Sequence, residues 1–216
     1  MQYHWDLSAA EAIALQKEMA PRVSLRDTFQ TIHKVAGVDV GFPRQGRETR
    51  AAVCVFDLDT LECIEQVTAT RPTRFPYIPG LLSFRELPAI LDAFAKLEHH
   101  PDLLLCDGQG IAHPRRFGVA CHLGVLLDMP SIGVGKTRLI GEYQPVPAAA
   151  GSWQKLTHHN ETVGAVVRTR HNVKPVFVSP GHRISLDSSI AWILKTVKGY
   201  KLPEPIRAAD KLASNR

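Results

Sequence analysis

Apolar runs of strand length, separated by short polar turns, fill the first third of the chain. Three runs rich in β-branched residues span 34–42, 50–57 and 62–70, with turn residues at 43–47 and 57–60. Such runs, bounded by turn residues, predict β-strands. Because the connections are short, we expect these three strands to form an antiparallel meander.

Four consecutive apolar residues, 103–106, come later in the chain and end at the carboxylate of Asp107. A short, continuous apolar run of this kind predicts a buried strand. Further strands are expected at 129–134, 161–170 and 174–178.

Helical spacing of apolar residues indicates the other elements. The pattern Ser8-Ala9-Ala10-Glu11 is a capping box and predicts a helix that ends at Pro21. Apolar residues on one face predict a second helix within 81–97, where Pro88 is expected in the first turn. Further helices are expected at 117–127, after Ser185 and from Pro203 onward.

The order of elements is a meander, a helix, a strand, a helix, a strand and then further α/β units. It predicts an α/β fold with a mixed central sheet flanked by helices. The polar segment 141–160 is expected to be a surface connection, and 179–182 a turn. Without internal repeats or long linkers, we expect a single domain with an N-terminal helix at 8–20, a core at 31–200 and a short terminal helix at 203–213.

Composition is that of a globular protein, with 216 residues, 44% hydrophobic and 22% charged. No run is long enough to span a bilayer and no signal peptide opens the chain, so we expect a cytoplasmic protein. The formal charge of +5 is compatible with a nucleic-acid partner. The four cysteines lack C-x-x-C spacing and are interpreted as reduced core thiols. No oligomerisation motif is present, so a monomer is expected.

Two acids lie on strands that could be neighbours. Asp39 lies within the first strand and Asp107 ends the fourth. A charge inside an apolar strand is costly unless it is paired or bound to metal; the alternative is an exposed strand end, where Asp39 caps a backbone amide. If the fourth strand pairs beside the first, as in ribonuclease H-like folds, the two carboxylates face each other. The two carboxylates repel each other unless a divalent cation joins them. Because the ligands are oxygens, Mg²⁺ or Mn²⁺ is favoured. The chemistry expected of such a site is metal-assisted hydrolysis of a phosphodiester bond.

The segment 71–80 carries three prolines within eight residues. It predicts a stiff loop without ladder partners. Its aromatic residues, Phe75 and Tyr77, have two interpretations: a wedge for unstacked bases, or packing on the core.

The loop after Asp107 is rich in residues that suit a ligand. Gly108 and Gly110 let a substrate approach the backbone, and His113 and an arginine pair at 115–116 follow. Arginines at such a strand end attract phosphate. The alternative is a turn with a surface basic pair.

Lys136 and Glu86 are further candidates. Gly135-Lys136-Thr137 is similar to the end of a P-loop, but Pro130 stands where that motif needs glycine, which excludes a nucleotide P-loop. Lys136 is still a candidate contact to a phosphate or a leaving group. Glu86 lies off the apolar helix face, and the alternative for it is a solvated first-turn acid.

Several blocks together resemble the endonuclease V family. They occur in the family's order, cover nearly the whole chain, and include two specific motifs, PYIPG followed by FRE and DGQG followed by HPRR. The blocks are Val38-Asp39-Val40, PYIPG at 76–80 with FRE at 84–86, DGQG at 107–110 with HPR at 113–115, GVGK at 133–136 and SPGH at 179–182.

The resemblance implies a ribonuclease H-like fold and a Mg²⁺ cofactor, for which Mn²⁺ is expected to substitute. It implies nicking of the second phosphodiester bond 3′ to a deaminated base, chiefly deoxyinosine, leaving 3′-hydroxyl and 5′-phosphate ends. By motif position the metal ligands and catalytic acids are Asp39, Glu86, Asp107 and Asp210, with Lys136 as a further catalytic residue. The implied DNA- or base-binding residues are Tyr77, Pro79, Gly80, Leu82, Arg85, Gly108, Gly110 and His113.

The expected partner is DNA with deaminated bases, and neither a membrane nor an obligate protein partner is implied. Backbone amides in the glycine-rich loop can donate to the oxygen of hypoxanthine and reject the amine of adenine, because a donor would then face a donor. Inosine in single strands or RNA stays open, because no residue obviously reads a 2′-hydroxyl. The rivals are another ribonuclease H-like nuclease and a non-catalytic binding module. The module predicts the loss of acids, yet all four are present.

Overall fold

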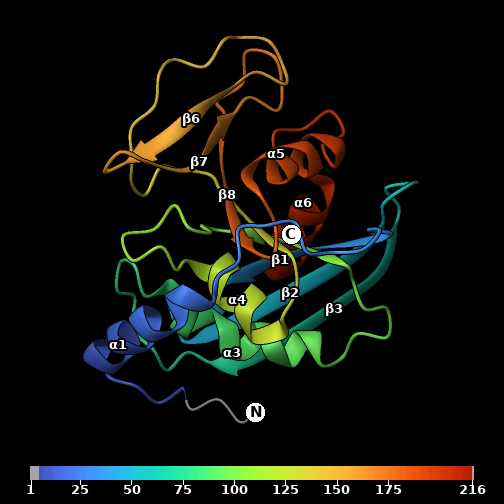
Figure 1. Cartoon of the computed structure of the whole chain (residues 1–216). Coiled ribbons are helices and arrows are strands. Elements are labelled where there is room, and N and C mark those ends of the chain that lie inside the picture. Colours follow the sequence, from blue (N-terminus) through green and yellow to red (C-terminus); the bar gives the residue numbers. More distant parts are fainter. Residues whose placement is uncertain (1–4, 216) are drawn as a thin grey trace.

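The computed structural model describes residues 5–215, and within them an eight-stranded mixed sheet forms the centre (Figure 1). The strand order is β3-β2-β1-β4-β5-β8-β7-β6. The strands are β1 (Lys34–Gly41), β2 (Glu48–Asp57), β3 (Cys63–Pro72), β4 (Leu103–Asp107), β5 (Ser131–Gly135), β6 (Trp153–His158), β7 (Glu161–Val167) and β8 (Val176–His182). The predicted antiparallel meander of β1, β2 and β3 is confirmed. β4 pairs beside β1, which was the condition for Asp39 and Asp107 to face each other, and the pairing is parallel.

Helices cover both faces of the sheet. They are α1 (Ala9–Met19), α2 (Pro43–Gly46), α3 (Leu82–Phe94), α4 (Val119–Leu127), α5 (Leu186–Lys195) and α6 (Glu204–Ala213), with a 3₁₀ turn at Ala20–Arg22. Alternate residues of β2 point to opposite faces, so Val53 and Val55 pack in the core with α3 while Cys54 and Phe56 pack in the core with α5 and α6. The predicted α/β fold with flanking helices is confirmed. None of the helices in residues 5–215 is long and apolar enough to cross a membrane.

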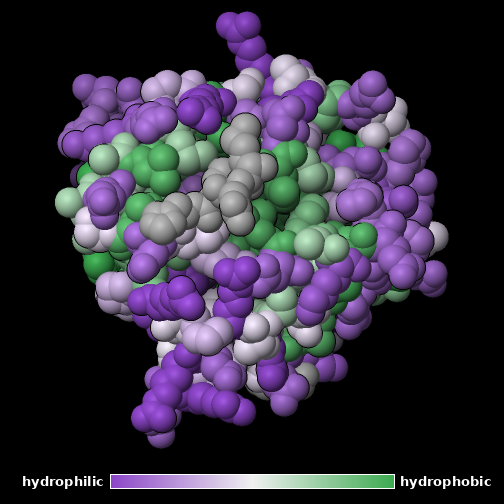
Figure 2. Space-filling view, turned by 90° about the horizontal axis from the view of Figure 1, so that it is seen from below, coloured by the Kyte–Doolittle hydropathy of each residue, from purple (hydrophilic) through white to green (hydrophobic). Residues whose placement is uncertain are grey.

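A small separate core joins α1 to the start of α3. It contains Ala12, Phe75, Leu81 and Phe84. These helices lie at the bottom of Figure 1, and Figure 2 views the molecule from that side. Apolar side chains gather around the middle of this face, and hydrophilic side chains dominate its rim. The capping box predicted for α1 is confirmed, since the Ser8 and Glu11 side chains each bond the other's backbone amide.

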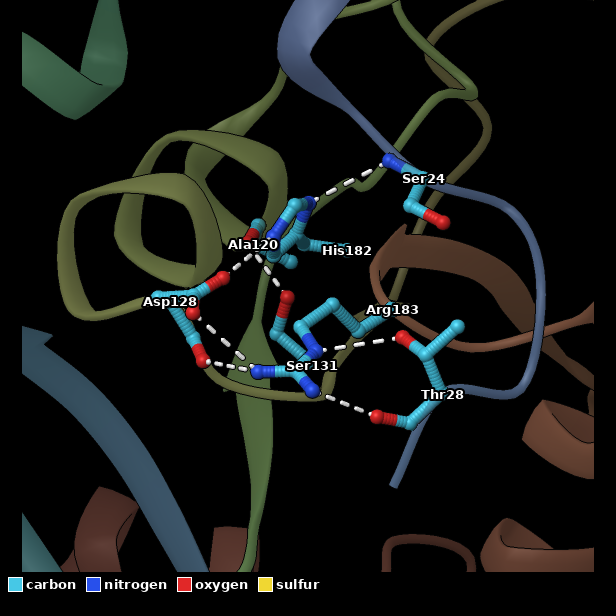
Figure 3. Close-up of polar contacts among 7 residues, drawn as sticks. All are labelled: Ser24, Thr28, Ala120, Asp128, Ser131, His182 and Arg183. Carbon is cyan, nitrogen blue, oxygen red and sulfur yellow. Dashed lines mark hydrogen bonds and ion pairs between the residues drawn. The ribbon is translucent and has the colours of Figure 1, made fainter.

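The segment between α1 and β1 is fastened across the end of β8 (Figure 3). The backbone amide of Ser24 donates to Nδ1 of His182 at 3.2 Å, and the guanidinium of Arg183 donates to the carbonyl of Thr28 at 2.6 Å. The same guanidinium also contacts the carbonyl and the carboxylate of Asp128. These contacts fix the part of this segment that follows the 3₁₀ turn and forms neither helix nor strand.

The polar segment expected to be a surface connection contains β6, so that prediction is wrong. Leu156 is the one fully buried side chain of this edge strand, and it packs with Val163, Val166 and Phe177. An edge strand buries few side chains, so its sequence has too few apolar residues to show the alternation of apolar and polar positions that is typical of a strand.

The expected turn at 179–182 is also wrong, because β8 continues through it. Proline lacks the amide that a central strand must donate. β7 pairs with β8 only up to Val178, so Pro180 lies beyond that ladder and pairs in register with Ile132 of β5. The ladder between β7 and β8 therefore loses no hydrogen bond at Pro180.

Three local boundaries differ from expectation. β3 runs on through Arg71 and Pro72, so the stiff loop begins after them. Pro88 lies inside α3 and not in its first turn, because the helix begins at Leu82. Helix α3 also ends before Leu97, which is buried beyond it.

The cysteines are all free thiols, as predicted. Cys54, Cys106 and Cys121 are buried, and burial raises the pKa of the Cys54 thiol to about 12. The prediction of a core position is wrong for Cys63, which is exposed on the edge strand β3.

Candidate active site

Three carboxylates meet where β1 and β4 end side by side. Asp39 comes from β1, Asp107 from the end of β4 and Asp210 from α6, and one oxygen of each lies within 4.8 Å of the others. The parallel pairing of β1 with β4 brings the first two together. Hence the expected proximity of Asp39 and Asp107 is confirmed, and Asp210 joins them.

Close packing of α6 on β1 brings Asp210 to the pair. A Cβ atom on Gly37 would lie 2.0 Å from the backbone carbonyl of Pro205, and one on Gly41 would lie 2.5 Å from that of Ala213. Any larger residue would therefore push α6 away from the sheet. The two glycines of β1 are the sequence feature that allows this third acid to approach.

The carboxylates are half-buried or buried, and two of them, Asp39 and Glu86, have a raised pKa. Burial, followed by the charge of Asp107, raises the pKa of Asp39 to about 8. Glu86 is 7% exposed on α3, and burial together with Asp39 and Asp107 raises its pKa well above the ordinary value. The alternative of a solvated first-turn acid is therefore wrong for Glu86. Glu86 borders the same pocket, but the group of mutually close oxygens does not include it.

Lys136 supplies the positive charge of the site. It follows β5, and its ammonium contacts Asp107 and lies 2.9 Å from Oδ1 of Asp210. Burial lowers the pKa of Lys136, but the charge of Asp107 and hydrogen bonds to both acids outweigh it and raise the pKa above its ordinary value. The lysine is therefore charged and placed beside the acids.

A pocket of about 470 Å³ opens beside the acids. Its walls come from the loop before α3, the loop after β4 and the segment after β5. Of the predicted site residues, the lining contains Asp39, Tyr77, Pro79, Gly80, Leu82, Glu86, Asp107, Gly108, His113, Lys136 and Asp210. Sequence reasoning missed other lining residues, among them Gln16, Gln109, Val119, Arg138 and Leu139. The last two lie two and three residues after Lys136, and this closeness in sequence is the one signal that could have found them.

The proline-rich loop separates the roles of its two aromatic residues. Phe75 is 5% exposed and its ring lies 5.7 Å from that of Phe84, so it packs on the core. Tyr77 is 69% exposed at the edge of the pocket. The packing alternative therefore holds for Phe75, and Tyr77 is available to a ligand.

The carbonyl of Gly80 anchors this loop to the rest of the site. It accepts hydrogen bonds from Gln16 at 3.0 Å, from Nε2 of His113 at 3.0 Å and from Arg115 at 2.6 Å. Nδ1 of His113 accepts from the amide of Arg115, so the imidazole is neutral with its proton on Nε2. Burial and the charge of Arg115 lower the pKa of His113 to about 4. His113 and Arg115 therefore position the loop, and so does Gln16 from α1.

Two predicted DNA contacts lie elsewhere. The guanidinium of Arg85 lies 4.4 Å from the ring centroid of Phe42 and borders a different hollow, of about 440 Å³, on the other side of α3. The amide of Gly110 donates to Oγ of Ser179 at 2.8 Å, and a Cβ atom there would lie 2.0 Å from the carbonyl of Pro180. Gly110 thus lets two backbones pack closely. The amide of Gly108 likewise already has a protein acceptor, the carbonyl of Val134.

The arginine pair after His113 is also engaged within the protein. Arg115 donates to Gly80 and to the side chain of Gln16. Arg116 forms an ion pair with Glu161 at 2.8 Å and donates to the carbonyl of His158. Both guanidiniums hold loops together, and the attraction of phosphate by this pair stays a prediction.

Comparisons with known proteins agree with this geometry. The family model described as Endonuclease V matches residues 17–211. The chain belongs to the endonuclease V family. A relative named Endonuclease V, from Nostoc sp., is 55% identical over 213 residues, covering 98% of this chain and 96% of that protein.

Solved structures of endonuclease V proteins share the fold. The protein from Streptomyces avermitilis superposes with a TM-score of 0.93 at 41% identity, over 100% of this chain and 95% of that chain. The protein from Ciona intestinalis, in complex with a 24mer DNA containing an inosine followed by a ribo-adenosine, gives 0.83 at 26% identity, over 95% and 96% of the two chains. The expected ribonuclease H-like fold and the expected nuclease activity of an endonuclease V are confirmed.

Proposed function

We propose that the chain is a Mg²⁺-dependent repair endonuclease for nucleic acid with deaminated bases, chiefly deoxyinosine in DNA. It cuts the second phosphodiester bond 3′ to the lesion and leaves 3′-hydroxyl and 5′-phosphate ends. The observation that carries this proposal is the group of three carboxylates, with oxygens within 4.8 Å of one another, beside a pocket of about 470 Å³. A hollow of that size is in the range of small-ligand sites.

The donor set fits a hard divalent cation. The potential ligands are carboxylate oxygens from Asp39, Asp107 and Asp210. Within the described part of the chain, no cysteine or histidine belongs to this group. Such donors favour Mg²⁺ or Mn²⁺ over softer metals. When bound there, the cation supplies a Lewis acid that activates water and stabilises the leaving oxygen.

The protein's own groups prepare the site for this charge. Without a cation, Asp39 holds a proton up to a pH of about 8, because burial and Asp107 oppose its ionisation. Ionisation of Asp39 therefore accompanies cation binding. Lys136 lies beside Asp107 and Asp210, where its ammonium can contact a phosphate oxygen of the scissile bond. Glu86 is buried beside these acids and is the group best placed to keep a proton.

The pocket wall supports recognition of a flipped base. The loop that carries Tyr77 is stiff, and its Gly80 carbonyl is held by three donors, so little freedom is lost when the exposed Tyr77 ring fills the space of an extruded base. Leu82 and Val119 provide apolar walls for a planar ring. The amides of Gly108 and Gly110 already have protein acceptors, so other groups of the wall, or a rearranged loop, must donate to the hypoxanthine oxygen.

The substrate class rests on the relatives. The Ciona endonuclease V was crystallised with DNA containing an inosine, and 26% identity at a TM-score of 0.83 supports the same class for this chain. The ribonucleotide after that inosine makes inosine-containing RNA a second candidate substrate. A monomeric state and a cytoplasmic location stay predictions.

The decisive experiment uses a labelled duplex with one deoxyinosine, incubated with Mg²⁺ or with EDTA. We expect a single nick at the second bond 3′ to the lesion with the wild type and with Asp59→Ala, a variant of an exposed turn acid. No nick is expected with EDTA or with Asp39→Ala. Cleavage of duplexes with and without inosine alike would overturn the proposal that the pocket recognises the deaminated base. Selective binding of the lesion without a nick would overturn the proposal that the protein is a nuclease.

A further inference from the structure

A hollow separate from the pocket beside the acids and from the hollow at Arg85 lies along the outer face of β6, and we call it the second hollow. It has a volume of about 470 Å³ and is lined by the segment 142–144 and by Trp153, Lys155 and Thr157, which share one face of the strand, together with Gln154. In Figure 1, β6 and β7 stand away from α1 and α3. Its two aromatic residues are Tyr143 and Trp153.

The hollow continues from the wall of the candidate active site. Arg138 and Leu139 line the catalytic pocket and follow Lys136 and Thr137 along the chain. The guanidinium of Arg138 lies 5.9 Å from the ring centroid of Tyr143, and Tyr143 in turn borders the second hollow. A strand that leaves the acids along this wall therefore meets the hollow next.

The aromatic surface is held in place, although it is exposed. The Tyr143 ring packs edge-on against Phe177 at 5.7 Å, and the backbones of Glu142 and Thr157 exchange hydrogen bonds of 2.8 and 2.9 Å. Tyr143 is nevertheless 39% exposed and Trp153 38% exposed. A rigid aromatic ring loses little entropy when a ligand stacks on it.

Exposed large apolar side chains concentrate around the two hollows. Of the seven in the described part of the chain, Tyr77 and Leu139 border the catalytic pocket, and Tyr143 and Trp153 border the second hollow. Arg138 and Lys155 add positive charge beside the aromatic rings, and Glu142 is the one acid of the lining. Aromatic faces with neighbouring cations are the usual composition of single-stranded nucleic-acid sites.

We propose that this hollow binds unpaired nucleotides of the nucleic-acid strand that adjoins the lesion, by stacking their bases on Tyr143 and Trp153. The inference rests on the proposed function for the identity of that strand. It adds a second contact region to the flipped-base pocket and favours substrates in which bases next to the lesion are unpaired.

The test measures the affinity of a labelled, short single-stranded oligodeoxynucleotide with one deoxyinosine, in EDTA, by fluorescence anisotropy. For Y143A/W153A we expect affinity to fall about tenfold or more, which corresponds to the loss of about one stacked base. The dependence of affinity on salt concentration should keep its slope, because stacking releases no counterions. Y143F should bind like the wild type, since it keeps the aromatic face.

Y200A is the matched control. Tyr200 is 51% exposed, and the guanidinium of Arg207 lies 4.0 Å from its ring centroid, so it repeats the chemistry of Tyr143 next to α6 and outside both hollows. Should loss of Tyr143 disturb its packing on Phe177, W153A alone serves as the second variant, because Trp153 lies on the outer face of an edge strand.

Equal affinities of Y143A/W153A and Y200A, or a weakened Y143F, would overturn the proposal. The same measurement with an inosine-free strand separates the two proposals. Loss of affinity in Y143A/W153A for both strands supports the stacking surface even if the wild type shows no preference for inosine. A wild type that binds both strands equally well would count against the proposed function and not against the stacking surface.

Discussion

At the scale of single residues, burial beside other carboxylates decides the behaviour of Asp39. Its pKa in the folded protein is about 8, against an ordinary value of 3.8. Between these two pH values the folded protein without metal keeps a proton that the unfolded chain has lost. The favourable contribution to stability is complete below pH 3.8 and is lost as the pH rises toward about 8.

We therefore expect Asp39→Asn to be more stable than the wild type at neutral pH in EDTA, because the amide needs no proton. The difference should grow with pH by at most about 1.4 kcal/mol per pH unit. Urea unfolding of both proteins at about pH 4 and about pH 8 measures it. Added Mg²⁺ should stabilise the wild type alone; a variant that is less stable at both pH values would contradict this account.

His122 behaves in the opposite way. It is 1% exposed, and burial lowers its pKa from 6.5 to about 3. Its Nδ1 lies 3.0 Å from Oγ of Ser83, among the rings of Phe84 and Phe117. Below pH 6.5 the unfolded chain binds a proton that the folded protein refuses, so stability falls as the pH falls toward about 3.

Replacing both partners, as His122→Phe with Ser83→Ala, should remove this acid sensitivity without leaving an unpaired hydroxyl. The wild type should lose up to about 1.4 kcal/mol per pH unit more than the double variant below pH 6.5. Denaturant unfolding across this pH range tests it. Parallel pH profiles for the two proteins would show that His122 is not the group responsible.

At the scale of elements, the contact between α6 and β1 decides whether the metal site is complete. Gly37→Ala would place a Cβ atom 2.0 Å from the carbonyl of Pro205, so α6 must move and take Asp210 with it. We expect a loss of about 1–3 kcal/mol in stability, as for other overpacked positions, and a larger loss of Mg²⁺ affinity than stability alone explains.

Calorimetric titration with Mg²⁺ measures that affinity, and Ile190→Val is the control. This variant removes one methyl group from the core on α5 and leaves the acids in place. It should lose stability and keep its Mg²⁺ affinity. Unchanged Mg²⁺ affinity in Gly37→Ala would mean that Asp210 does not need the close approach of α6.

Element boundaries were predictable where most consecutive residues of a strand are buried and apolar. β1, β2 and β4 are apolar on both faces because helices cover both sides of the sheet, and their sequences indicate strands directly. β6 buries Leu156 alone among six residues, and Pro180 lies in the part of β8 that pairs with β5 but no longer with β7. Both depend on the neighbouring strand, which local patterns do not contain.

At the scale of the whole molecule, the two large cores share the same strands. β1, β2 and β4 each contribute side chains to both cores. Disrupting the core on one face of the sheet therefore also disrupts the core on the other face. We propose that the chain is a single domain that unfolds in one step. Coincident denaturation curves from tryptophan fluorescence and far-ultraviolet circular dichroism would agree, because Trp5, Trp153 and Trp192 report from three separate regions. Separate transitions would indicate more than one domain.

Order along the chain and residue chemistry were enough to predict the meander, because it follows from apolar runs and short connections. The meeting of Asp39 with Asp107 was predicted on the condition that the fourth strand pairs beside the first, as β4 does. The motifs around Tyr77 and Asp107 also indicated the family. The direction of Arg85, the engaged amide of Gly110 and the contacts of Gly80 with Gln16 and Arg115 depend on residues from distant segments packing together. Their positions follow from steric fit and hydrogen-bond partners, which exist only once the folded chain has brought those segments into contact.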